Sequence, residues 1–139
     1  LYMARNKEAE EALMPFFDYL DRCTVITDRL IVTGENPDVV VLAGRGFASD
    51  GVVMGAWYSS VANQGRTLDR LRRRPALFVI LLDEQGFRER FPPIAQYVDE
   101  EYRPLATLRD PGIEVPIFVH ERRAASRMDS PTGWPCFRM

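Results

Sequence analysis

The feature that most constrains the fold is the apolar run at residues 76–82, which reads Ala-Leu-Phe-Val-Ile-Leu-Leu. Pro75 precedes this run and Asp83-Glu84 follows it, so its ends are sharply marked. A strand that is apolar on both faces must be covered on both faces, as the central strands of α/β proteins are. The run therefore predicts a small three-layer α/β domain whose sheet is mostly parallel.

The segments on either side fit that architecture. Apolar residues recur at helical spacing between residues 9 and 20, and a further helix is expected to begin at Pro93. The remaining strands are expected at residues 29–33, 103–108 and 113–121. Asp110-Pro111-Gly112 is a tight-turn sequence, so the last two strands should form a C-terminal antiparallel hairpin.

Residues 36–44 carry two conflicting signals. Asn36-Pro37-Asp38 is typical of a helix start, with a capping side chain, proline at the first position and an acid in the first turn. The β-branched run at residues 39–42 favours a strand instead. We give the cap more weight and predict a short helix that ends at Gly44.

The chain has 139 residues and a net charge of −2, which indicates one domain and argues against nucleic acid as a partner. Residues 1–123 are expected to form that α/β domain. Residues 124–139 are expected to be a tail that packs on it through Trp134 and Phe137. We interpret the arginines at 72–74 as cations that complement the dipole of the preceding helix, rather than as a nucleic-acid site.

Two cysteines lie far apart, at Cys23 and Cys136, which excludes a closely spaced redox or metal motif. They are either buried thiols or a disulfide between the tail and the end of the first helix, near which we expect the tail to dock. His120 is the one histidine, so no metal site and no cofactor are predicted. We read it as an ordinary histidine at a strand end.

The candidate ligand-binding residues fall in three places. Asp83 and Glu84 follow the central strand, and ligands of open α/β sheets bind outside the carboxyl ends of strands. The same acids could instead cap the next helix or face water. Trp57-Tyr58, among glycines and serines, are typical either of a sugar-facing surface or of aromatics that cover a sheet edge. Arg45 is a further candidate, and no catalytic residue is assigned.

The order of these segments resembles a known family. The residues that carry the resemblance are the stretches at 24–32, 36–45, 71–75 and 91–104, which include Asn-Pro-Asp, Arg-Arg-Arg-Pro, Phe-Pro-Pro and Tyr-Arg-Pro. Together they are similar to the soluble carboxyl-terminal domain of bacterial polytopic membrane glycosyltransferases, the dolichyl-phosphate-mannose–protein mannosyltransferase-like enzymes. The similarity spans residues 16–119.

The resemblance implies a non-catalytic, extracytoplasmic (periplasmic) domain that shapes the acceptor side or stabilises the membrane part of a glycosyltransferase-like protein. Its partners would be the membrane part of the same polypeptide and a glycan or lipid-linked sugar. That family's catalytic carboxylates lie in its membrane part, so none is carried over, and the membrane helices would precede Leu1. The alternatives are a small self-contained α/β enzyme that uses Asp83 and Glu84, and a ligand-sensing module with a site at the same strand ends.

Overall fold

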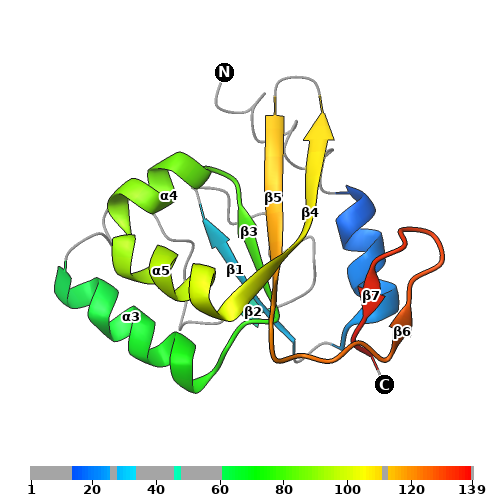
Figure 1. Ribbon diagram of the computed structural model, residues 1–139, viewed down its shortest axis with the longest axis horizontal. Helices are drawn as coiled ribbons and strands as arrows, with labels where there is room; N and C mark the ends of the chain where they lie inside the picture. The colour runs from blue at the N-terminus through cyan, green and yellow to red at the C-terminus, as the bar shows by residue number, and fades with distance from the viewer. Residues whose placement is uncertain (1–13, 26–27, 34–45, 48–60, 111–112, 139) are drawn as a thin grey trace.

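The computed structural model describes residues 14–25, 28–33, 46–47, 61–110 and 113–138 (Figure 1). Within these ranges the chain forms a five-stranded sheet in the order β2-β1-β3-β5-β4, together with a separate two-stranded hairpin, β6-β7. The helices are residues 14–23, α3 (Val61–Arg73), α4 (Glu84–Arg90) and α5 (Pro92–Glu101). The strands are β1 (Arg29–Thr33), β2 (Gly46–Phe47), β3 (Phe78–Leu81), β4 (Tyr102–Asp110), β5 (Ile113–His120), β6 (Arg127–Met128) and β7 (Pro135–Cys136).

The predicted central strand is confirmed. β3 is the middle strand of the sheet, all four of its residues are buried, and it pairs in parallel with β1. The expected hairpin is also present, as β4 and β5 pair antiparallel along their length. The sheet is mixed rather than mostly parallel, because β5 pairs antiparallel with β3. The helix expected at residues 36–44 lies outside the described residues.

Alternate side chains of the central strands enter two separate apolar clusters. Phe78 and Ile80 pack with residues from the helix at 14–23, whereas Val79 and Leu81 pack with residues from α3, α4 and α5. Figure 1 shows the same division, with α3, α4 and α5 beside one face of the sheet and the helix at 14–23 beside the other. Both faces of β3 are thus buried, as its doubly apolar sequence requires.

Local sequence explains the connection between β3 and β4. Phe91 ends α4, and Pro92 then begins α5 at a position where its missing N–H costs no helical hydrogen bond. Phe87 and Phe91 stack one turn apart, with ring centroids 6.1 Å apart. The buried Tyr102 hydroxyl donates a 2.6 Å hydrogen bond to the carbonyl oxygen of Ala76, so its burial leaves no polar atom unsatisfied there.

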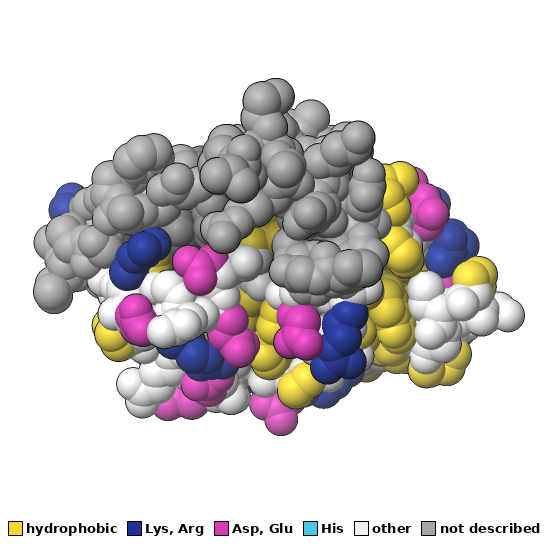
Figure 2. Space-filling model, turned by 90° about the horizontal axis from the view of Figure 1, so that it is seen from above, with side chains coloured by type: hydrophobic (Ala, Val, Ile, Leu, Met, Phe, Trp, Pro, Cys, Tyr) yellow, Lys and Arg dark blue, Asp and Glu magenta, His cyan; other side chains and the backbone are white. Residues whose placement is uncertain are grey.

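The described surface carries charges of both signs. Seen from above, acidic and basic side chains are intermixed over the half of the molecule that holds α4 and α5 (Figure 2). Among the described helices, none combines the length and the apolar character needed to cross a lipid bilayer.

Candidate functional site

The acids that follow β3 make local structural contacts. Asp83 is the N-cap of α4, and its Oδ1 accepts a 3.1 Å hydrogen bond from the backbone N–H of Gly86. Glu84 lies in the first turn of that helix, with one carboxylate oxygen 3.8 Å from a guanidinium nitrogen of Arg88. The pair therefore lies at the strand end, as predicted, and both side chains take part in organising α4.

The other predicted residues lie elsewhere. Arg45, Trp57 and Tyr58 are outside the described residues, so the structure does not place them beside Asp83. His120 ends β5 and is buried against the ring of Tyr102, with centroids 4.9 Å apart. Its Nδ1 accepts a hydrogen bond from the backbone N–H of Arg122, and burial lowers its pKa, which favours the neutral ring.

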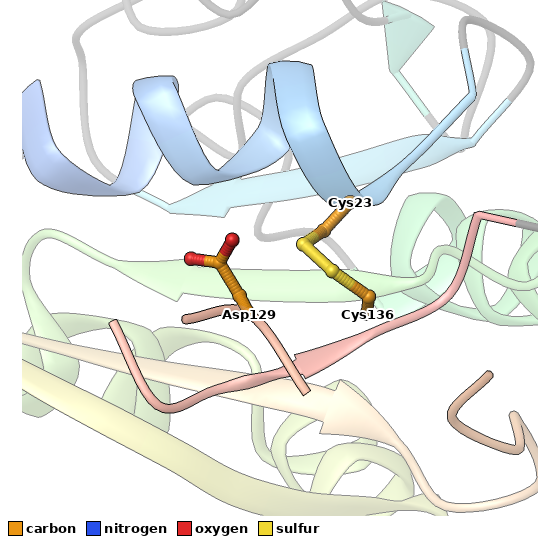
Figure 3. Close-up of side chains that lie close together, drawn as sticks. All are labelled: Cys23, Asp129 and Cys136. Carbon is orange, nitrogen blue, oxygen red and sulfur yellow. A yellow bond between two sulfur atoms is a disulfide. The ribbon is translucent and has the colours of Figure 1, made fainter. Parts of the chain in front are cut away.

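The most elaborate group of polar contacts joins the tail to the first helix. Cys23, at the end of that helix, forms a disulfide with Cys136 in β7, and their Cα atoms are 4.4 Å apart (Figure 3). The backbone N–H of Phe137 donates to the carbonyl oxygen of Cys23 at 2.8 Å. The expected contact between the tail and the Cys23 end of the helix is therefore present, and the sulfurs are bonded.

A buried carboxylate lies beside this disulfide. Asp129 receives two hydrogen bonds of 2.9 Å from Nε and Nη2 of Arg22, one at each carboxylate oxygen, and a third of 2.6 Å from the hydroxyl of Thr132. The hydrogen bonds from Arg22 and then from Thr132 hold the pKa of Asp129 far below its usual range. The same contact raises the pKa of Arg22. Asp129 is therefore ionised at neutral and mildly acidic pH.

A second ion pair fixes the start of the tail. Nη1 of Arg123 lies 2.9 Å from Oδ1 of the buried Asp28, whose other oxygen accepts from the backbone N–H of Val25. The Arg123 guanidinium also lies over the ring of Phe137, 5.9 Å from its centroid. We call this whole group the tail clamp: Arg22, Cys23, Asp28, Arg123, Asp129 and Cys136.

Aromatic packing continues the tail clamp into the core. The ring of Trp134 meets that of Tyr19 edge-on at 5.1 Å, and the Tyr19 hydroxyl donates to the carbonyl oxygen of Pro135. Burial, and then the nearby Asp129 charge, raise the pKa of Tyr19. Phe137 lies 5.9 Å from the ring of Phe78 in the central strand. The two anchors predicted from the sequence, Trp134 and Phe137, are thus both in contact with the body.

Sequence reasoning missed the Asp129 part of the tail clamp. Asp129-Ser130-Pro131-Thr132 has the residues of a turn in which the first side chain accepts a hydrogen bond from the backbone nearby. The turn contacts of Asp129 could therefore have been predicted from the sequence. Arg22 was not identifiable as its partner, because 107 positions separate the two and several other arginines were equally available.

Three potential metal ligands come together here. One ligand atom each from Cys23, Cys136 and Asp129 lies within 4.8 Å of the others. In the structure the sulfurs are bonded to each other and both carboxylate oxygens accept from Arg22, so this group serves to cross-link the chain.

Comparison with known proteins does not identify a relative. No protein-family model matches the chain, and neither the curated proteins nor the solved structures contain a significant match.

Proposed function

We propose that this chain is a non-catalytic, extracytoplasmic domain of a membrane-bound glycosyltransferase-like protein, where it shapes the acceptor side or stabilises the membrane part. The observation that carries the proposal is the buried Cys23–Cys136 disulfide. The segment order described above supplies the link to glycosyltransferases.

The disulfide supports a location of this domain in an oxidising compartment. Structural disulfides persist outside the cytoplasm and are rare in the reducing cytosol of most organisms. Both cysteines are fully buried, and the surrounding ion pairs and aromatic contacts depend on the same docked tail. A fold that uses a disulfide to hold its final segment is suited to the periplasmic side of a membrane.

The contacts of Asp83 favour an appendage over a self-contained enzyme. The enzyme alternative needs this acid to face a ligand at the strand end, and here it caps α4. Glu84 is likewise engaged with Arg88 in the same helix. Neither contact indicates a substrate, and the Asp83 cap has a clear role in folding.

We also propose that the architecture is three-layered, as the sequence predicted. The support is the division of the core into two clusters, one shared by the sheet and the helix at 14–23, the other by the sheet and α3, α4 and α5. Exposure of either cluster to solvent in the isolated chain, measured by hydrogen exchange, would contradict this arrangement.

Topology of the parent protein tests the proposed location. Alkaline phosphatase fused after Met139 should be active, because that reporter folds only where disulfides form, and a green fluorescent protein fusion should be dark. The opposite pattern would overturn the proposal.

A second experiment tests the non-catalytic role. The parent protein should transfer sugar from a lipid-phosphate donor, and the 139-residue chain alone should not. Turnover by the isolated chain that is lost in Asp83→Asn would favour the enzyme alternative. Asparagine is the sharper substitution because it also caps helices, so the fold is retained while the carboxylate is removed.

A further inference from the structure

The outer side of α3 carries a row of arginines. Arg66, Arg70 and Arg73 recur at helical spacing, and the backbone N–H of Arg74 donates to the carbonyl oxygen of Arg70, so the turn continues past the helix end. All four side chains are exposed, whereas Leu71, on the opposite side of the helix, is fully buried. We call Arg66, Arg70, Arg73 and Arg74 the arginine face.

Three of these arginines, Arg70, Arg73 and Arg74, are poorly balanced by acids. None of the ion pairs within the described ranges includes Arg70, Arg73 or Arg74. Asp69 is the one acid in the segment, and Nε of Arg73 bonds to its backbone oxygen rather than to its carboxylate. On the face seen in Figure 2 acidic and basic side chains are intermixed, whereas the arginine face carries charges of one sign in a chain of net charge −2.

The helix dipole does not account for the whole row. Cations stabilise a helix mainly within its last turn, which holds Arg70, Arg72 and Arg73. Arg66 lies a turn earlier and Arg74 lies beyond the end. Burial raises the pKa of Tyr97 in α5, and the charge of Arg72 partly opposes that rise.

The spacing of the arginines indicates which kind of ligand the arginine face can bind. From Arg66 to Arg74 there are eight residue steps, so at the helical rise the four guanidinium groups span about 12 Å along a convex surface. Such a row cannot converge on one small anion, but it matches a plane of phosphate groups, each of which a guanidinium binds with two hydrogen bonds.

We propose that the arginine face lies against a membrane surface rich in anionic phospholipid and orients the domain there. This inference rests on the proposed membrane attachment. The net negative charge of the rest of the chain would point the other faces toward water, and it disfavours the deeper contact that a nucleic acid would need.

Vesicle sedimentation tests the proposal on the 139-residue chain. Vesicles of equal parts phosphatidylglycerol and phosphatidylcholine should carry the chain down at low salt, and vesicles of phosphatidylcholine alone should not. Binding should be lost near 1 M NaCl, where the screening length falls to about 3 Å. Arg70→Gln with Arg73→Gln should weaken partitioning about 10- to 30-fold, as expected for two arginines at an anionic surface. Glutamine keeps the helix propensity of arginine.

The matched control removes two charges from another surface. Arg109→Gln with Arg122→Gln takes away two highly exposed arginines, each within 4 Å of a glutamate, and should leave partitioning within about twofold of the unsubstituted chain. Equal loss in both double variants, or no binding to phosphatidylglycerol, would overturn the proposal. So would displacement by millimolar inorganic phosphate, which indicates a discrete anion site, or tighter binding to a single-stranded oligonucleotide at the same salt. The phosphatase fusion reports the compartment independently, so failure here leaves that result intact.

Discussion

On one face of the sheet, α3, α4 and α5 belong to a single stretch of chain between Val61 and Glu101, whereas the other face is covered by residues from opposite ends of the described chain. The first face is held by apolar packing and by tyrosine hydroxyls that donate to nearby backbone, as Tyr102 does to Ala76. The second face has apolar packing and, in addition, the tail clamp.

The ion pairs follow the same division. Pairs beside the continuous helical stretch are exposed, such as Arg88 with Asp99, whose side chain is 56% exposed. The pairs of the tail clamp have buried acids, with Asp129 only 3% exposed. Segments that are neighbours in sequence find each other with little entropy cost, whereas segments about a hundred residues apart must close a long loop before any contact forms. The disulfide and the ion pairs with buried acids occur where the entropy cost of loop closure is largest.

The largest expected effect comes from opening the disulfide. It joins cysteines 113 positions apart, and in the chain-entropy model such a cross-link contributes about 4–5 kcal/mol. Cys23→Ser with Cys136→Ser should lower the free energy of unfolding by about that amount in urea titrations. Hydrogen exchange should show protection lost first at residues 14–23 and 126–138. Uniform loss over α3, α4 and α5 would contradict the division into two differently held faces.

Core truncations test whether the two faces of the sheet are held differently. Phe16 and Ile94 are both fully buried, one in each cluster, and replacing either by alanine should cost about 2–5 kcal/mol in the oxidised protein. In the disulfide-free variant Phe16→Ala should cost clearly less, because its surroundings are already loosened, while Ile94→Ala should cost the same. If removing the disulfide reduced the cost of both truncations equally, the two faces would unfold as one unit.

Sequence reasoning succeeded where the signal was local. The apolar run at 76–82 predicted the central strand, and the Asp-Pro-Gly sequence predicted the hairpin that became β4 and β5. The mixed character of the sheet was missed, because no local pattern records which strand a hairpin joins. For the candidate site, the position of Asp83 at a strand end was predictable. The pairing of Arg22 with Asp129 was not, since it is decided by how the tail docks.

Removing the charge of Asp129 should have a smaller effect than either truncation. Asp129→Asn keeps the shape of the side chain but weakens both hydrogen bonds from Arg22, so unfolding at neutral pH should need less urea. Asp99→Asn is the matched control, because Asp99 also receives two hydrogen bonds from one arginine but is exposed, and it should change stability very little.

The pH dependence of that variant has a definite sign. Because the pKa of Asp129 is lowered in the folded chain, its carboxylate contributes stability above the ordinary aspartate value of about 3.9 and loses it as the pH falls below that value. The difference between Asp129→Asn and the unsubstituted chain should therefore shrink from about pH 4 downward. A difference that stays constant to lower pH would mean that the ion pair is not its source.

The smallest effect is expected from replacing Asp83. Its hydrogen bond to Gly86 is local to α4, which packs on the face of the sheet opposite the tail clamp. Asp83→Ala removes the cap of α4 and should cost about 1 kcal/mol, with faster hydrogen exchange at Gly86, whose N–H would lose its acceptor. Asp83→Asn should restore most of that loss because asparagine caps equally well. Both values should be the same in the oxidised chain and in the disulfide-free variant, since the cap involves residues three positions apart and no part of the tail. A cost of Asp83→Ala that changes when the disulfide is removed would join α4 energetically to the tail clamp, and the two faces would then have to be treated as one cooperative structure.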